Sequence, residues 1–61
     1  MNIGDRVILI DVPDCMPEDL FKVGTFKGYG IVDSNKEQCV NVLLDGEDGL
    51  TVCYERQLMK L

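Results

Sequence analysis

The segment at residues 23–33, VGTFKGYGIVD, constrains the fold more than any other part of the chain. Its apolar residues are interrupted by three glycines, Gly24, Gly28 and Gly30. Counted with the period of two that a strand requires, the apolar positions change from one face to the other near Gly28 and Gly30. Glycine inside a strand often marks a bulge or a sharp bend. The segment is therefore predicted to be a strand that bends where it leaves one sheet and enters the next.

A glycine-rich segment can also bind phosphate, but then it must follow a strand and open a helix. Residues 23–33 lack the Gly-Lys-Ser/Thr ending of a P-loop and the glycine spacing of a dinucleotide-binding loop, and no amphipathic helix pattern follows. Neither a nucleotide site nor any other cofactor is expected.

The beginning of the chain predicts a strand and then a long loop. Residues 3–12, IGDRVILIDV, are rich in β-branched residues and too short for a helix of normal length. Pro13 and Pro17 follow, and they exclude a continuous strand ladder. Residues 17–21 are expected to form one helical turn inside this loop, because proline suits the first helical position.

The second half predicts a hairpin and a short closing strand. Residues 38–45, QCVNVLLD, form the clearest strand, with Val40, Val42 and Leu44 on one face. The turn DGEDG leads to a returning strand at residues 50–54. The next three residues are expected to form a 3-10 turn, and the last four a short strand.

The predicted fold class is all-β: one domain over residues 1–61, with about five short strands, a long first loop and a 3-10 turn before the last strand. A chain of this length makes at most one domain. A small barrel of two orthogonally packed sheets suits this size. Closing the barrel would also remove exposed sheet edges.

Several residues resemble an SH3-like barrel of the KOW type. The resemblance covers nearly the whole chain and is carried by turn and packing residues: Gly4-Asp5-Arg6-Val7, the glycine-spaced strand that ends at Val32, the segment from Val40 to Gly46, and Leu58. In size and pattern the chain is also similar to very small acidic barrel proteins of bacteria and phages, which implies an accessory protein of a phage or mobile element. Because KOW domains mostly bind RNA or ribosomal and transcription proteins, the resemblance implies nucleic-acid or ribonucleoprotein binding as an alternative function.

The charge balance argues against that alternative. Eleven acidic residues against six basic ones give a net charge of −5, and the bases are spread along the chain. Nucleic-acid-binding proteins gain most of their affinity by neutralising phosphates with Lys and Arg. Nucleic acid is thus an unexpected partner, although an acidic inhibitor that imitates nucleic acid remains a further alternative.

Composition also restricts chemistry and location. The chain has no histidine, and its three cysteines include no C-x-x-C pair, so neither a catalytic set nor a metal site is predicted. We expect a protein that is not an enzyme. No apolar run approaches the ~20 residues needed to cross a bilayer, and no secretory signal precedes the first strand. A cytoplasmic protein without membrane contact is expected.

The candidate function is therefore protein–protein interaction through the first loop and a few aromatic side chains. The first loop holds four acids in nine residues, a pattern suited to a basic partner, although solvated loop charge that maintains solubility has the same appearance. Recognition of proline-rich peptides would need an aromatic-lined groove, for which the aromatic residues are few. Homo-oligomerisation is also possible, because so small a domain gains stability by assembly. The candidate contact residues are Asp11, Asp14, Glu18, Asp19, Phe21, Tyr29 and Tyr54.

Overall fold

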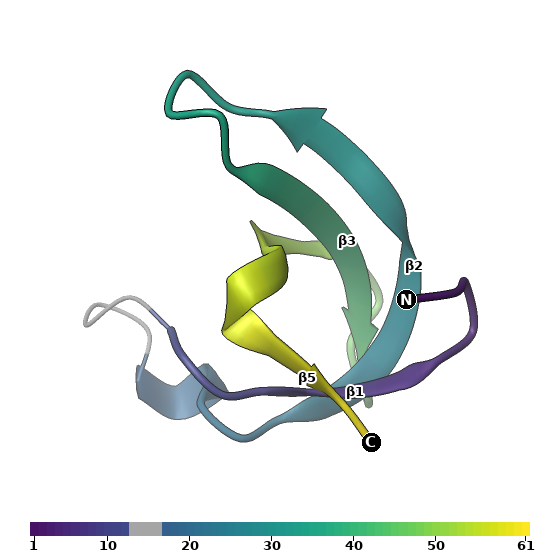
Figure 1. Ribbon diagram of the computed structural model, residues 1–61. Helices are drawn as coiled ribbons and strands as arrows, with labels where there is room; N and C mark the ends of the chain where they lie inside the picture. The colour runs from purple at the N-terminus through teal and green to yellow at the C-terminus, as the bar shows by residue number, and fades with distance from the viewer. Residues whose placement is uncertain (13–16) are drawn as a thin grey trace.

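Figure 1 shows the computed structural model of the protein, which describes residues 1–12 and 17–61. Five antiparallel strands form one open sheet in the order β4-β3-β2-β1-β5. The elements in chain order are β1 (Arg6–Leu9), the 3-10 helix η1 (Pro17–Asp19), β2 (Val23–Val32), β3 (Gln38–Leu44), β4 (Thr51–Tyr54), the 3-10 helix η2 (Glu55–Gln57) and β5 (Leu58–Lys60). The all-β class and the 3-10 turn before the last strand are confirmed.

The glycine-rich strand β2 bends as predicted, but it remains within one sheet and does not pass into a second. Its first residues pair with β1, and its whole length pairs with β3, with register shifts between Phe26 and Gly28 and between Tyr29 and Val32. Gly28 has a φ of +134°, a backbone conformation that side chains with a Cβ rarely adopt. Together β2 and β3 curve strongly, and η2 lies on the concave side of the curve (Figure 1).

The first strand is shorter than the predicted segment 3–12. Gly4 has a φ of +97°, and the N–H of Asp5 donates to the carbonyl of Asn2, so the chain turns before β1 begins. Beyond β1, the N–H of Ile10 donates to the carbonyl of Gln57 in η2. The Ile10 side chain is 41% exposed, because here the chain has left the face that covers the core.

The core is small and apolar, and it uses the alternation seen in the sequence. Val40, Val42 and Leu44 of β3 are each at most 1% exposed, as their shared face predicts. Of the four aromatic residues, Phe26 alone is fully buried. The edge of the Phe26 ring packs against Tyr29 at 5.1 Å between centroids. The remaining members of the core cluster are Val7, Leu9 and Leu58.

The two edges of the sheet are β4 and β5, which η2 joins along the chain. They do not pair with each other within residues 1–12 and 17–61. Among the described residues, the outer side of β4 therefore has no partner strand. The helical elements of the described chain are η1 and η2, and neither is long and apolar enough to cross a membrane.

Candidate partner-binding site

A surface hollow lies against β4, and it brings together three of the seven predicted contact residues. It has a volume of about 290 Å³. Asp11 and Asp19 reach it from the first loop, and Tyr54 reaches it from the end of β4. The remaining lining residues are Cys39, Thr51, Val52, Cys53 and Gln57. Carboxylates and an apolar strand thus share one surface.

Local hydrogen bonds hold the end of the first loop in place. Asp19 ends η1, and its carbonyl accepts a hydrogen bond from the N–H of Lys22 at 3.1 Å. The N–H of Phe21 donates to the carbonyl of Leu9 at 2.8 Å, and the N–H of Leu9 donates to the carbonyl of Lys22. These bonds tie the loop to the end of β1, so Asp19 has a defined position beside the hollow.

The other wall of the hollow is the edge strand and the turn that follows it. Val52 is 64% exposed, although it is a large apolar residue in a strand. Gln57 is buried, and its side-chain oxygen accepts a hydrogen bond from the backbone N–H of Tyr54 at 2.8 Å. The arrangement fixes η2 against the end of β4.

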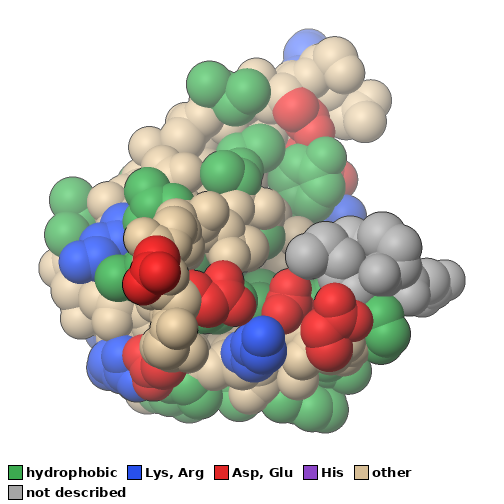
Figure 2. Space-filling view, turned by 180° about the vertical axis from the view of Figure 1, so that it is seen from behind, with side chains coloured by type: hydrophobic (Ala, Val, Ile, Leu, Met, Phe, Trp, Pro, Cys, Tyr) green, Lys and Arg blue, Asp and Glu red, His purple; other side chains and the backbone are tan. Residues whose placement is uncertain are grey.

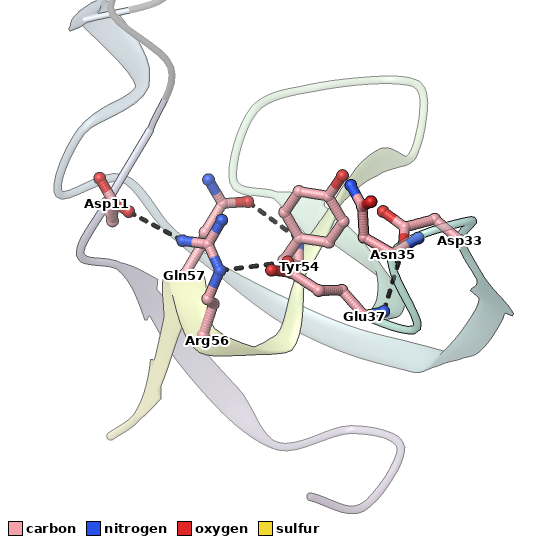
Figure 3. Close-up of polar contacts among 7 residues, drawn as sticks. All are labelled: Asp11, Asp33, Asn35, Glu37, Tyr54, Arg56 and Gln57. Atoms are coloured by element: carbon pink, nitrogen blue, oxygen red, sulfur yellow. Dashed lines mark hydrogen bonds and ion pairs between the residues drawn. The ribbon is translucent and has the colours of Figure 1, made fainter.

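Two clusters of charge stand beside the hollow, each with one base shared between two acids. Arg56 binds Asp11 at 3.3 Å and Glu37 at 3.2 Å (Figure 3). Lys22 binds Asp19 at 2.9 Å and Glu47 at 3.4 Å. Each cluster therefore keeps one net negative charge. Acidic and basic side chains also lie side by side on the face of the molecule that Figure 2 shows.

Tyr54 connects the hollow to the turn between β2 and β3. The guanidinium of Arg56 lies over its ring, 5.1 Å from the centroid. An interaction between its hydroxyl and the carboxylate of Asp33 lowers the pKa of Asp33 and raises that of Tyr54. Asp33 Oδ1 also accepts the backbone N–H groups of Asn35 and Glu37 (Figure 3).

The thiol of Cys53 is not activated as a nucleophile. Burial raises the pKa of Cys53 to about 11, with a smaller contribution from Cys39. At neutral pH this thiol is therefore protonated, and a protonated thiol is a poor nucleophile. Cys15 lies outside the described residues.

The other predicted contact residues do not line the hollow. Glu18 is exposed in η1. Tyr29 is also exposed, and its hydroxyl accepts a hydrogen bond from the amino terminus. An interaction with Glu55 raises the pKa of Tyr29. Phe21 is 65% exposed and has a φ of +68°, a left-handed backbone conformation that is unusual for a bulky residue. Asp14 lies outside the described residues.

Five lining residues of the hollow were not among the predicted contact residues, and neither was Arg56 beside it. The five are Cys39, Thr51, Val52, Cys53 and Gln57. Val52 alternates with Tyr54 in the sequence, which predicts a shared face but does not show that β4 is an edge strand. A buried glutamine after a strand has no distinctive spacing. Arg56 could have been predicted from the local sequence, because it follows Tyr54 by two positions and long basic side chains often stack on a nearby aromatic ring.

Metal ligands do not converge on this site: residues 1–12 and 17–61 contain no cluster of three carboxylate or thiol side chains that could hold an ion. The surface instead offers carboxylates, an apolar strand edge and an aromatic ring. No protein-family model, curated protein or solved structure matches the chain.

Proposed function

We propose that the protein is a non-enzymatic binding module that recognises a basic segment of another protein through the hollow beside β4. The single observation that carries the proposal is the lining of that hollow. It combines the carboxylates of Asp11 and Asp19 with the exposed apolar side chain of Val52 and the ring of Tyr54. A basic, partly apolar segment complements both features.

The charge clusters support a basic partner because their bases can be exchanged. The ion pair between Arg56 and Asp11 is exposed on both sides, and in the pair between Lys22 and Asp19 the base is exposed. Water and salt weaken exposed ion pairs. Each base is shared between two acids, so an incoming Lys or Arg gains a carboxylate without an unpaired base being left behind. The residual negative charge also attracts a basic segment over a distance of ~8 Å at physiological ionic strength.

The distribution of the basic side chains favours a protein partner over nucleic acid. Within the described residues, four of the six bases already bind carboxylates: Arg6, Lys22, Arg56 and Lys60. A phosphate backbone would have to compete with those carboxylates. Since phosphate contacts by Lys and Arg supply most non-specific affinity, nucleic-acid binding by this surface would be weak.

Phe21 supports a second contact on the first loop. A large apolar side chain is held in solvent, on a backbone conformation that disfavours it. Strained backbone positions cluster at functional sites, where binding compensates for the strain. We therefore include Phe21 in the proposed contact surface, apart from the hollow itself.

The proposal also includes the fold family. The strand order, the bend in β2 and the 3-10 turn before β5 support an SH3-like barrel of the KOW type that stays open between β4 and β5. In this view the protein is an accessory protein of the phage or mobile-element kind, acting in the cytoplasm by contact alone.

Titration of the protein with a lysine-rich peptide, followed by calorimetry at low and moderate salt, tests the proposal. Replacing Asp11 and Asp19 by Asn should weaken binding by roughly fivefold for each carboxylate, and most of the affinity should be lost as salt rises. Asp48→Asn is the matched control, because Asp48 is exposed but does not line the hollow. The proposal would be contradicted if Asp11→Asn and Asp19→Asn bound the peptide as tightly as the control Asp48→Asn. It would also be contradicted if the unchanged protein did not bind the peptide at low salt.

A further inference from the structure

The hydrogen-bonding direction of β3 can be derived from one bond at its end. The N–H of Asp45 donates to the carbonyl of Val23, so the backbone of Asp45 faces β2. Along a strand, successive residues point their backbone N–H and C=O groups to opposite sides. Both register shifts place the extra residue on β2, so this alternation continues without interruption through β3. Val42 and Val40 therefore present their backbone groups to β4 on the other side.

The alternation in β3 determines which residues of β4 point their backbone groups away from the sheet. Val42 is opposite Thr51 and Val40 is opposite Cys53, so these two residues of β4 form the hydrogen-bonded pairs with β3. The backbone groups of Val52 then point away from β3, and so do those of Tyr54. The bond from the Tyr54 N–H to the side chain of Gln57 agrees, because it requires that N–H to point outward.

Val52 thus stands at an open position of the edge. Its backbone N–H and carbonyl face outward, and within residues 1–12 and 17–61 neither has a partner outside the strand ladder. Its side chain is largely exposed, and the residue lines the same hollow as Asp11 and Asp19. Unpaired edge groups beside a groove are the geometry in which an extended peptide adds to a sheet.

We infer that the partner binds as a sixth strand along the outer edge of β4, as an extended segment in which Lys or Arg alternates with apolar residues. This inference rests on the proposed function and specifies its geometry. Alternate side chains of a strand point to opposite faces, so basic residues at every second position all reach the face of Asp11 and Asp19. Main-chain hydrogen bonds to Val52 supply affinity, and the alternating bases supply selection.

A second copy of the chain does not suit this edge. Pairing β4 with β4 of another molecule would bring two hollows together, each with its own Asp11 and Asp19. Both molecules carry a net charge of −5, and like charges placed together oppose association. Charge complementarity therefore assigns the edge to a basic partner.

The test uses an extended peptide of about eight residues in which lysine alternates with valine, a probe of strand addition. Val52→Pro removes the outward N–H but leaves the ladder to β3 intact, since proline is tolerated at an edge position of this kind. Val52→Thr is the matched control, because it keeps the N–H and a β-branched side chain. Strand addition predicts at least a tenfold loss of affinity in Val52→Pro and at most a small change in Val52→Thr.

Equal binding by both variants would overturn strand addition while leaving the proposed function standing, since the peptide would then be held by side chains alone. No binding by the unchanged protein at low salt would overturn both. Amide hydrogen exchange in the unchanged protein gives a second measurement that does not depend on the folding of the proline variant. The Val52 N–H should exchange rapidly in the free protein and become protected on peptide binding, and continued rapid exchange in the complex would contradict the inference.

Discussion

The hydroxyl of Tyr54, at the end of β4, interacts with the carboxylate of Asp33, in the turn after β2, and this interaction lowers the pKa of Asp33 and raises that of Tyr54. It couples two segments that lie 21 positions apart in the sequence at the rim of the site. The interaction is the largest contribution to the lowered pKa of Asp33, ahead of the backbone N–H of Glu37. It also limits the orientations open to the Tyr54 ring, which lies under Arg56.

Replacing Tyr54 by Phe should raise the pKa of Asp33 toward its ordinary value of 3.8. Because the folded-state pKa is lowered, ionised Asp33 stabilises the fold above that ordinary value, and the contribution is lost as pH falls through the folded-state pKa. The variant should therefore lose less stability on acidification. An NMR titration of the Asp33 carboxyl measures the shift directly. Tyr29→Phe is the control, because Tyr29 binds Glu55 and should leave Asp33 unchanged.

Replacing Gly24 by Ala should destabilise the protein. An added Cβ would lie 2.6 Å from the backbone oxygen of Leu43 and 2.9 Å from a methyl group of Val42, so β2 and β3 would have to separate. Overpacking of this kind costs roughly 1–3 kcal/mol. For a domain of this size each kcal/mol lowers Tm by about 4–8 °C, which calorimetry resolves.

Gly49→Ala provides the comparison for Gly24→Ala, because a Cβ at Gly49 meets nothing within 4 Å. Its stability should remain within about 0.5 kcal/mol of that of the unchanged protein. If both alanine variants melted at the same temperature as the unchanged protein, the close approach of β2 and β3 at Gly24 would be wrong.

Cys53 should make the fold sensitive to alkali. Its pKa is raised in the folded protein from 9.0 to about 11, first by burial. A raised pKa means that the neutral thiol stabilises the fold below pH 9, and that this contribution is lost as pH rises through the folded-state value. Urea unfolding at several pH values should show a smaller alkaline decline for Cys53→Val than for the unchanged protein. The two tyrosines titrate in both proteins, so the comparison isolates the thiol.

Phe21→Asn should separate stability from binding. Asn tolerates the left-handed backbone better than Phe, so the variant should be as stable as the unchanged protein, or more stable by up to about 1 kcal/mol. If Phe21 contacts the partner, affinity for the natural partner should nevertheless fall. Lys36→Asn is the control. Lys36 has a φ of +64°, so its replacement by Asn should relieve a similar backbone strain at a position away from the first loop. A Phe21 variant that is destabilised and binds normally would assign Phe21 a structural role instead.

Much of the fold could be predicted because local patterns and tertiary structure agree. The alternation of Val40, Val42 and Leu44 faces the core, and the parity change near Gly28 corresponds to a bulge. The predicted length of the first strand was wrong because the chain turns at Gly4, which has a positive φ. The sequence alone does not show whether a glycine has a positive or a negative φ. Burial of Phe26 but exposure of Phe21 also depends on packing that no short window contains.

The candidate site was only partly predictable, because it is assembled from distant segments. The sequence shows that Asp11, Asp19 and Tyr54 are suited to binding, but their convergence on one hollow depends on the path of the first loop. The open position at Val52 depends on strand order, which places β4 at an edge. Neither property has a signal in the residues themselves.

The contact between Gln57 and Tyr54 has a consequence for alignment. Gln57 already occupies the outward N–H of Tyr54, so a guest strand that slides along β4 in this direction finds no donor beyond Val52. Sliding by two residues therefore forfeits a main-chain bond, and a slide by one would turn every guest side chain to the opposite face. The buried side-chain amide of Gln57 thus favours one register of the guest strand over the alternatives.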